Sequence, residues 1–413
     1  MGINVFDNAS FRIDDYVNEI IEMQRRLTAT QAIGPENGGK GEYEKAEYIK
    51  ERLEVLNPDE LIEINAPDER VQNGYRPNIA VLFNGRISYS TLWIITHLDV
   101  VPPGNLKLWE SDPFKIEIKD KKIYGRGVED NQQGLVASYM AVKALKDEDA
   151  IPYRRIGLLM VSDEETGSEK GLKYVLSQRK DLFGDKDLII VPDFGSSEGT
   201  MVEVAEKSLL WLKFQVLGKQ GHSSRPDLAI NSFKVEAYLV SKLDRLYETY
   251  NQEDPMYTFP KSSFESTKKE ANVPNINTIP GEDIFYMDCR ILPKIKVDDV
   301  ISSVNAISRG IGYKFKVKVN VSMVQRADAA PSTDANAPVV KALIRAIKSI
   351  KGEIAKPMGI GGGTVAAFLR REGIPVAVWA TIDERAHQPN EYCTLDNIIN
   401  DAKVFLHVTL QES

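Results

Sequence analysis

The chain has 413 residues, of which 42% are hydrophobic and 27% are charged, and its formal net charge at pH 7 is −8. One hydrophobic core rarely organises this many residues, so the length predicts two domains. The negative charge argues against nucleic acid as a partner, and no apolar run is long enough to cross a membrane.

The first half of the chain alternates between helical and strand-like patterns. Helical spacing of apolar residues occurs in four segments: 20–27, 46–53, 132–146 and about 170–180. Short apolar runs typical of buried strands occupy four others: 79–83, 91–96, 156–161 and 187–192. This alternation predicts an α/β fold with a mostly parallel sheet sandwiched by helices.

The pattern changes near residue 208. A predicted strand at 209–218 is followed by a long amphipathic helix at 230–250. Two strands come next, at 275–279 and 284–292, with a Pro-Gly turn between them. A helix that starts at 297 and a strand of alternating pattern at 313–323 complete the segment. This β-α-β-β-α-β order predicts a small two-layer domain. The first pattern resumes with a helix at 337–350, a strand at 376–380 and a helix from about 395. We therefore expect a domain at 208–323 that is inserted into a discontinuous domain of 1–207 and 324–413.

Residues suited to metal binding or proton transfer follow several of the predicted strands and hairpins. There are six of them: His97, Asp130, Glu164, Glu165, Asp193 and His387. Ligand sites in open α/β sheets form outside the carboxyl ends of the strands. Five ligands and one spare carboxylate at such positions predict a two-metal site with a general base, and therefore a hydrolase.

Taken alone, each of these residues also has an ordinary structural interpretation. Asp130 stands where an aspartate often caps a helix, and His97 could simply hydrogen-bond a loop. The adjacent carboxylates of Glu164 and Glu165 should repel each other unless a positive group compensates, although a solvated acidic loop is the alternative. Asp99, two residues beyond His97 on an extended segment, points the same way and could orient its imidazole.

The ordered series of motifs resembles the dinuclear zinc peptidase and deacylase family. That family includes carboxypeptidase G, acetylornithine deacetylase, succinyl-diaminopimelate desuccinylase, aminoacylase, carnosinase and bacterial dipeptidases. The matching segments cover nearly the whole chain: THLDVVP, WESDPF, GRGVEDNQQG, SDEETGS, the Asp193 turn, GKQGHSSRP, NTIPG with DCR, GGGT and AHQPNEY. The resemblance implies a zinc-peptidase-like catalytic domain with an inserted lid or dimerisation domain.

The resemblance also implies roles for the candidate residues. One metal would be bound by His97, Asp130 and Asp193, and the other by Asp130, Glu165 and His387. Glu164 would be the general base, and Asp99 the partner of His97. The expected cofactors are two Zn²⁺ ions, for which Co²⁺ or Mn²⁺ could substitute.

Further roles implied by the resemblance fall in and after the inserted domain. His222 would stabilise the oxyanion in the site of a neighbouring subunit, so we expect a homodimer formed through this domain. Asn277 and Arg290 would hold the substrate backbone and carboxylate. The substrate pocket would be shaped by Gly362, Gly363 and Thr364. Read without the resemblance, His222 is a histidine in a Gly-Ser turn and Arg290 is a surface strand residue.

Two departures from the family pattern bear on the substrate. Asn131 and Gln132 stand where the family often has Met-Lys, and Asp193 stands where many deacylases have Glu. The aspartate is typical of the dipeptidase and aminopeptidase branches and favours a peptide with a free amine. Small peptides and N-acyl amino acids both remain open as substrates.

Two other classes of function compete with this interpretation. A non-catalytic amino-acid-binding protein would not need Glu164 as a base. A two-metal phosphoesterase would need a basic phosphate cradle, which the motifs lack. The first ten residues do not resemble a signal peptide, and Cys289 and Cys393 are too few for a disulfide scaffold. A cytoplasmic location is therefore expected.

Overall fold

A computed structural model describes residues 2–412, and the chain divides into two compact units. Unit 1 comprises Met1–Val204, Thr333–Pro357 and Thr364–Ser413. Unit 2 comprises Ala205–Ser332 and Met358–Gly363. Within residues 2–412, no helix is both long enough and apolar enough to span a bilayer.

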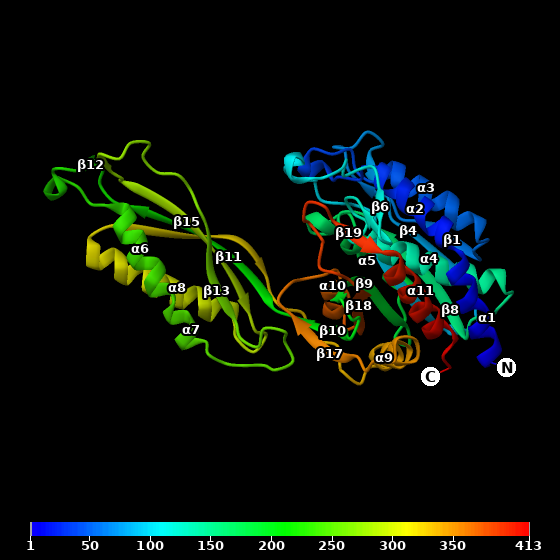
Figure 1. The fold of residues 1–413 in the computed structure, drawn as a ribbon. Helices are drawn as coiled ribbons and strands as arrows, with labels where there is room; N and C mark the ends of the chain where they lie inside the picture. Colours follow the sequence, from blue (N-terminus) through cyan, green and yellow to red (C-terminus); the bar gives the residue numbers. More distant parts are fainter. Residues whose placement is uncertain (1, 413) are drawn as a thin grey trace. The chain divides into compact units, whose positions relative to one another are not determined.

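An eight-stranded sheet forms the centre of unit 1 (Figure 1) and has the order β1-β4-β8-β5-β9-β18-β10-β17. The strands are β1 (Glu60–Glu63), β4 (Ile79–Phe83), β5 (Ile87–His97), β8 (Arg154–Val161), β9 (Leu188–Ser196), β10 (Met201–Glu206), β17 (Lys356–Ile360) and β18 (Val376–Thr381). Along the chain, β10 and β17 lead from one unit into the other. The neighbours β8, β5, β9 and β18 are parallel, which confirms the expected parallel sheet for its centre. The flanking pairs β1–β4, β4–β8 and β10–β18 are antiparallel.

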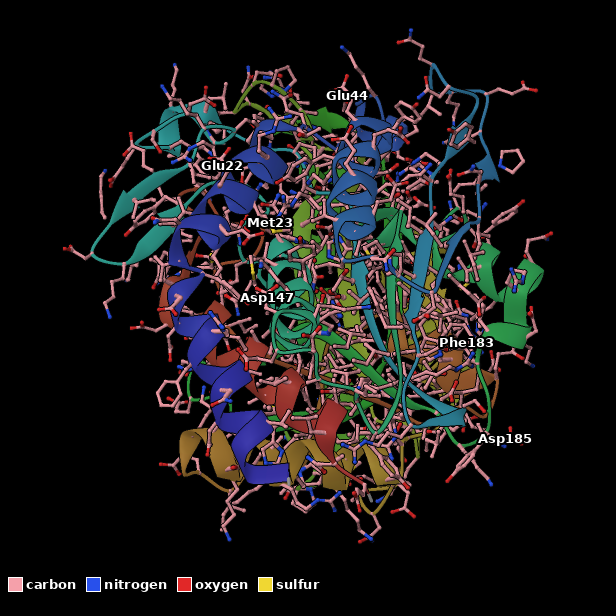
Figure 2. The ribbon with its side chains drawn as sticks, turned by 90° about the vertical axis from the view of Figure 1, so that its right-hand side faces the viewer. Glu22, Met23, Glu44, Asp147, Phe183 and Asp185 are labelled. Carbon is pink, nitrogen blue, oxygen red and sulfur yellow. The ribbon has the colours of Figure 1, made fainter. Side chains whose placement is uncertain are left out.

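Helices cover both faces of this sheet. They are α1 (Gly2–Asp15), α2 (Val17–Ala29), α3 (Tyr43–Val55), α4 (Gln132–Asp147), α5 (Leu172–Arg179), α9 (Pro338–Lys351), α10 (Ala366–Arg371) and α11 (Leu395–Leu410). Leu172 of α5 and Leu369 of α10 belong to one buried cluster with Trp93 on one face, while α4, α9 and α11 pack on the other. Figure 2 shows Met23 of α2 and Asp147 of α4 on one side of the strands and Phe183 on the other. Because both faces are covered, the second half of β5 is buried, and it contains the apolar run Leu92–Ile95 shortly before His97.

Three short strands link distant loops of unit 1. They are β6 (Glu117–Lys119), β7 (Lys122–Tyr124) and β19 (Tyr392–Thr394), and β7 lies between the other two. Because Tyr124 pairs with Tyr392, the chain after β7 runs beside the chain before β19. A two-residue pair, β2 (Ala66–Pro67) with β3 (Tyr75–Arg76), completes the sheets of this unit.

Unit 2 contains a four-stranded antiparallel sheet of order β13-β15-β11-β16, with helices on one face (Figure 1). In chain order its elements are β11 (Ser208–Leu217), α6 (Ser232–Leu243), α7 (Arg245–Thr249), β13 (Ser263–Lys269), β15 (Glu282–Ile291), α8 (Val297–Phe315) and β16 (Lys318–Ala327). The rings of Phe214 and Phe285 stack with centroids 4.5 Å apart in its core. The expected β-α-β-β-α-β order is therefore present.

Two details of unit 2 differ from the sequence prediction. The segment 275–279 is not a strand of this sheet, because only Thr278–Ile279 forms a short β14, which pairs with β12 (Gly221–His222). The strand that the sequence predicted at 275–279 is replaced in the sheet by the edge strand β13, which lies earlier in the chain. Most of β13 is exposed, so its sequence carries no alternating apolar signal. The last strand also begins later than expected, since α8 continues to Phe315 and ends at Lys316 in the left-handed conformation.

Candidate metal centre

The carboxyl ends of three neighbouring strands bring most of the candidate residues together. His97 is the last residue of β5, and Glu164 and Glu165 form a single turn directly after β8. Asp193 does not follow β9 as expected but lies within it. The register between β9 and β18 shifts there, from Val191 opposite Val378 to Gly195 opposite Ala380. Such an irregularity re-aims a side chain, and it brings Asp193 to His97.

The other two candidate ligands come from loops. Asp130 lies in the turn between β7 and α4, and His387 lies between β18 and β19 with a left-handed φ of 64°. The Nε2 atom of His97 lies 2.9 Å from Oδ1 of Asp130 and 3.3 Å from Oδ1 of Asp193. The Nε2 atom of His387 lies 3.1 Å from Oδ2 of Asp130 and 3.0 Å from Oε2 of Glu165. The two oxygens of Asp130 therefore face two different histidines.

These donor atoms have the chemistry and spacing of a metal site. Two groups have ligand atoms that all lie within 4.8 Å of one another: His97 with Asp130 and Glu165, and His97 with Glu164 and Asp193. Nitrogen and oxygen ligands 2.0–2.2 Å from a tetrahedral zinc ion are roughly 3.3–3.5 Å apart. The His97–Asp193 separation of 3.3 Å lies in that range, and the other three separations are a few tenths of an ångström shorter, so a small displacement of these side chains would admit the ion.

The electrostatics of the cluster also favour a cation. Burial, and then the charge of Asp193, raise the pKa of Glu164 well above its usual range. Burial, and then the charge of Asp130, raise the pKa of Glu165 to about 7. Hydrogen bonds to Asp130 and Glu165 raise the pKa of His387 to about 10. Although burial opposes it, hydrogen bonds to Asp130, Asp193 and Asp99 raise the pKa of His97. The cluster thus attracts positive charge, which divalent ions supply more effectively than protons do.

Asp99 makes two distinct contacts in this cluster. Its backbone carbonyl oxygen lies 3.0 Å from Nδ1 of His97, closer than its carboxylate at 3.5 Å. The carboxylate instead accepts the backbone N–H groups of Glu164 and Glu165, each at 3.0 Å. When the Nδ1–H donates to the carbonyl, Nε2 remains free to bind a metal. Asp99 thereby joins the histidine at the end of β5 to the acidic turn after β8.

Asn131 has a structural role that the sequence did not reveal. Its amide group donates to the carbonyl of Pro192 at 2.6 Å and to Oδ1 of Asp193 at 2.9 Å. Its side-chain oxygen accepts the N–H of His97 at 3.4 Å. Gln132 is buried as well and accepts a hydrogen bond from the Thr28 hydroxyl at 3.0 Å. No local pattern signals such contacts, because the partners lie far away along the chain.

Lys45 of α3 is a second residue that sequence analysis passed over. Its side chain is buried, and its ammonium group has no hydrogen-bond partner among residues 2–412. Burial lowers the pKa of Lys45 to about 8, while the nearby charges of Asp99, Glu42 and Glu391 oppose that shift. It therefore places a buried positive charge near Asp99.

The metal cluster belongs to unit 1. Five of the predicted substrate or oxyanion residues belong to unit 2: His222, Asn277, Arg290, Gly362 and Gly363. Thr364 begins the last segment of unit 1. His222 is exposed on β12, and its Nδ1 lies 2.8 Å from the Ser224 hydroxyl. Asn277 is adjacent in space, because its carbonyl accepts the N–H of Ser223 at 3.0 Å.

Arg290 joins β15 to the glycine segment within unit 2. Its guanidinium donates to both carboxylate oxygens of Asp288, at 2.7 and 2.9 Å, and to the carbonyl of Gly361 at 3.1 Å. The nearby Lys207 is buried and donates to the carbonyl of Phe259 at 2.8 Å. Arg290 thus contacts the glycine segment directly, and the backbone N–H of Lys207 donates to the carbonyl of Ile360, next to Gly361, at 3.1 Å.

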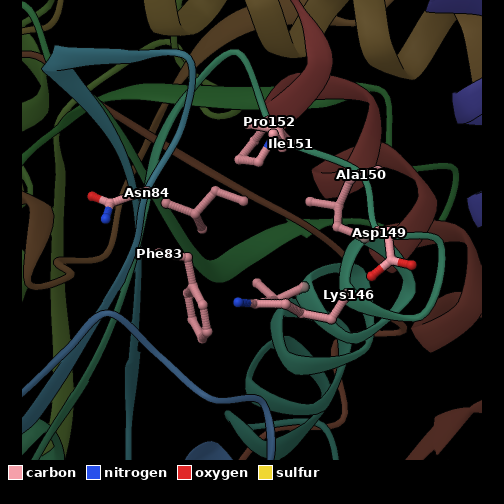
Figure 3. A pocket seen from close by; sticks show the side chains of 10 residues that line it. Phe83, Asn84, Lys146, Asp149, Ala150, Ile151 and Pro152 are labelled. Carbon is pink, nitrogen blue, oxygen red and sulfur yellow. The ribbon is translucent and has the colours of Figure 1, made fainter.

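A separate pocket of about 220 Å³ lies at the other end of the sheet (Figure 3). Its lining includes Phe83 of β4, Lys146 of α4 and Ile156 near the amino end of β8. The Nζ atom of Lys146 lies 5.0 Å from the centre of the Phe83 ring. Glu164 follows the carboxyl end of β8, so this pocket forms no part of the candidate metal centre.

Comparison with known proteins gives matches in both sequence and fold. The family model described as peptidase family M20/M25/M40 matches residues 93–411. An uncharacterized metallohydrolase of Methanococcus maripaludis is 41% identical, over 95% of this chain and 99% of that protein. A succinyl-diaminopimelate desuccinylase of Wolbachia pipientis is 30% identical, over 92% of this chain and 89% of that protein. The crystal structure of human carnosine dipeptidase 1 has the same fold, with a TM-score of 0.78 over 98% of both chains at 18% identity.

The geometry of Asp130 leads to a prediction about metal content. After dialysis against trace zinc, elemental analysis should find close to two metal ions per chain, the number expected for a two-metal site. Asp130→Ala should lose more metal than His387→Ala, because Asp130 faces both histidines. A wild-type ratio that stays near zero would rule out a metal centre here.

Proposed function

The chain belongs to the M20/M25/M40 peptidase family, and on that premise we propose that it is a two-metal amidohydrolase that cleaves small peptides or N-acyl amino acids. Membership confirms the resemblance of the ordered motifs and makes the protein a metallohydrolase of amide or peptide bonds. One observation carries the proposal of two metals: the oxygens of Asp130 face His97 on one side and His387 on the other.

The proposed ligand sets share Asp130. His97, Asp130 and Asp193 would hold one ion, and Asp130, Glu165 and His387 would hold the other. When bound, such a pair supplies a Lewis acid for the scissile carbonyl and a lowered pKa for the attacking water. We propose zinc as the native metal, with Co²⁺ or Mn²⁺ able to replace it, because nitrogen and carboxylate donors suit all three ions.

Glu164 is the proposed general base. No described residue donates a hydrogen bond to its carboxylate, whereas the carboxylate of Glu165 contacts His387. The backbone N–H of Glu164 donates to the Asp99 carboxylate, and this bond restricts the positions that the Glu164 side chain can reach. In the proposed reaction Glu164 takes a proton from water, the oxygen of that water bonds to the substrate carbonyl carbon, and Glu164 delivers the proton to the amine as the C–N bond breaks.

The predicted binding residues and the comparisons bear on the substrate class. We propose that Asn277 and Arg290 hold the backbone and carboxylate of the substrate, since a guanidinium binds a carboxylate with two parallel hydrogen bonds. The glycine turn Gly362-Gly363 and Thr364 would shape the pocket. Asp193 favours a free-amine peptide, while the similarity to a desuccinylase favours an N-acyl amino acid. A cytoplasmic location stays a prediction from the sequence.

A hydrolysis screen tests this proposal. The full-length protein, supplied with Zn²⁺ or Co²⁺, should release amine from one of two panels: unmodified dipeptides, or N-acetyl and N-succinyl amino acids. Activity that is confined to dipeptides would select the peptidase function, and activity on acylated amino acids would select the deacylase function. Tight amino-acid binding without turnover would instead support a binding protein, and activity on phosphate esters would support a phosphoesterase.

The two adjacent glutamates should respond differently to the same substitution. Glu164→Gln should keep its metal content but lose roughly 10²–10⁴-fold in kcat, the usual contribution of general acid–base catalysis. Glu165→Gln should lower metal affinity, because it removes a negatively charged ligand. The measurements are metal content and steady-state kinetics for both variants. Full activity of Glu164→Gln would show that the roles are assigned wrongly.

We further propose that unit 2 mediates a homodimer and that His222 acts in the partner's site. The exposed position of His222 on β12 is compatible with such a role. His222→Ala and Glu164→Gln chains, each inactive alone, should regain part of the activity when they are mixed. One site of each heterodimer then contains both residues. Removal of an oxyanion donor typically costs about 10²–10³ in kcat, so the recovery is large enough to measure. Mixed chains that exchange subunits without recovery would exclude the cross-subunit role.

A further inference from the structure

Two buried carboxylates join the loop that bears Asp130 to the loop that bears His387. Glu129 directly precedes Asp130, and Glu391 follows His387 by one short turn. Glu391 is fully buried, and Glu129 is 4% exposed. Neither side chain is a candidate ligand, and neither contributes to an apolar core.

The carboxylate of Glu391 receives the backbone of the Asp130 loop. Its Oε1 accepts the N–H groups of Glu129 at 3.0 Å and of Asp130 itself at 3.1 Å. Its Oε2 accepts the N–H of Gly127 at 3.0 Å and the Arg126 guanidinium at 2.5 Å. In addition, the backbone carbonyl of Glu391 accepts the N–H of Gly125 at 3.0 Å, next to the β7–β19 pairing.

The carboxylate of Glu129 does the same for the His387 loop. Its Oε1 accepts the N–H of Asp383 at 2.6 Å, and its Oε2 accepts the N–H of Arg385. Each loop therefore contributes a carboxylate that binds backbone N–H groups of the other loop. We call this arrangement, made by Glu129 and Glu391, the reciprocal clamp.

Burying the charged carboxylates of Glu129 and Glu391 costs folding free energy. Two further buried carboxylates stand beside a cluster already rich in acids, and burial raises the pKa of both. A carboxylate, however, accepts hydrogen bonds at both oxygens, and bonds to an ionised acceptor are roughly twice as strong as neutral ones. A neutral amide could accept at one oxygen only. The reciprocal clamp therefore lowers the stability of the fold but connects the two loops firmly.

A firm connection matters because of what these loops carry. Asp130 and His387 both lie outside regular secondary structure, and surface loops are usually mobile. A metal site needs its ligands to be placed to within a few tenths of an ångström. The Nε2 of His387 and the Oδ2 of Asp130 lie 3.1 Å apart, with the clamp bonded to the backbone on either side.

We propose that Glu129 and Glu391 are positioning residues that preorganise the metal position shared by Asp130 and His387. They bind no metal and touch no reacting atom. They fix the distance between the two loops before the ion arrives, so the ion does not have to order them. This inference rests on the proposed two-metal function and deepens it.

Full-length Glu391→Gln and Glu129→Gln variants test the clamp through metal affinity and through backbone protection. Competition with a chromogenic chelator should show the second zinc equivalent binding about 10–100-fold more weakly, the usual effect of losing a residue that supports a ligand. The double variant should lose less than the two single effects combined, since both residues hold the same pair of loops. Hydrogen–deuterium exchange of the metal-free protein should be faster at 127–130 in Glu391→Gln and at 383–385 in Glu129→Gln.

Asp187 offers a matched control. It accepts the N–H groups of Thr91 at 2.6 Å and Gly184 at 2.9 Å and the indole of Trp93 at 3.2 Å, just before the amino end of β9. Asp187→Asn should alter stability without altering zinc affinity. If Glu391→Gln fails to fold, Glu129→Gln, which disturbs fewer bonds, decides the question.

The possible outcomes separate the clamp from the function on which it rests. Wild-type protein that binds no zinc would end the proposed function. Wild-type protein with two zinc ions, and folded variants with unchanged affinity and exchange, would overturn the clamp alone. An equal loss of affinity in Asp187→Asn would also overturn it, because the effect would then be one of general stability.

Discussion

An excess of buried negative charge at one edge of a parallel sheet governs the rest of unit 1. Carboxylates gather there with the imidazoles of His97 and His387 among them. The pKa values of Glu165 and His387 are both raised, so both groups bind protons more tightly than usual. Isolated charges are expensive to bury, so such a cluster persists only if the surrounding fold holds it together and a cation neutralises it. Asp99, Asn131 and the buried Lys45 belong to that surrounding support.

The sheet explains why residues from distant parts of the sequence could be recognised as one site. Parallel strands end at the same edge, so a polar residue after each buried run predicts a shared location. That argument placed His97, Glu164 and Glu165 correctly at the edge from their own segments. It was less accurate for Asp193, because the apolar run ends at residue 192 while the backbone continues as a strand with a register shift.

Other features could not be read from the sequence, for physical reasons. The edge strand β13 is largely exposed and has no apolar alternation, whereas 275–279 resembles a strand but mostly forms a turn. The bonds from Glu391 to Gly127 and Asp130 connect loops that are 261 or more positions apart. A glutamate near a helix or strand looks the same in a sequence whether it faces water or a neighbouring backbone. For Glu391, the answer depends on the pairing of β7 with β19, which brings its carboxylate to the backbone of the Asp130 loop.

The order of the proposed ligands along the chain has a consequence for biosynthesis. His97, Asp130 and Glu165 emerge from the ribosome before unit 2, whereas His387 and Glu391 emerge only after the whole of unit 2. At ~5–20 residues per second, the delay between them is on the order of tens of seconds. During translation the acidic edge lacks both its second histidine and the strand that pairs with β7. A nascent chain that stalls before residue 387 would therefore carry an unfinished centre, and the proposed hydrolytic activity would require synthesis to pass β19.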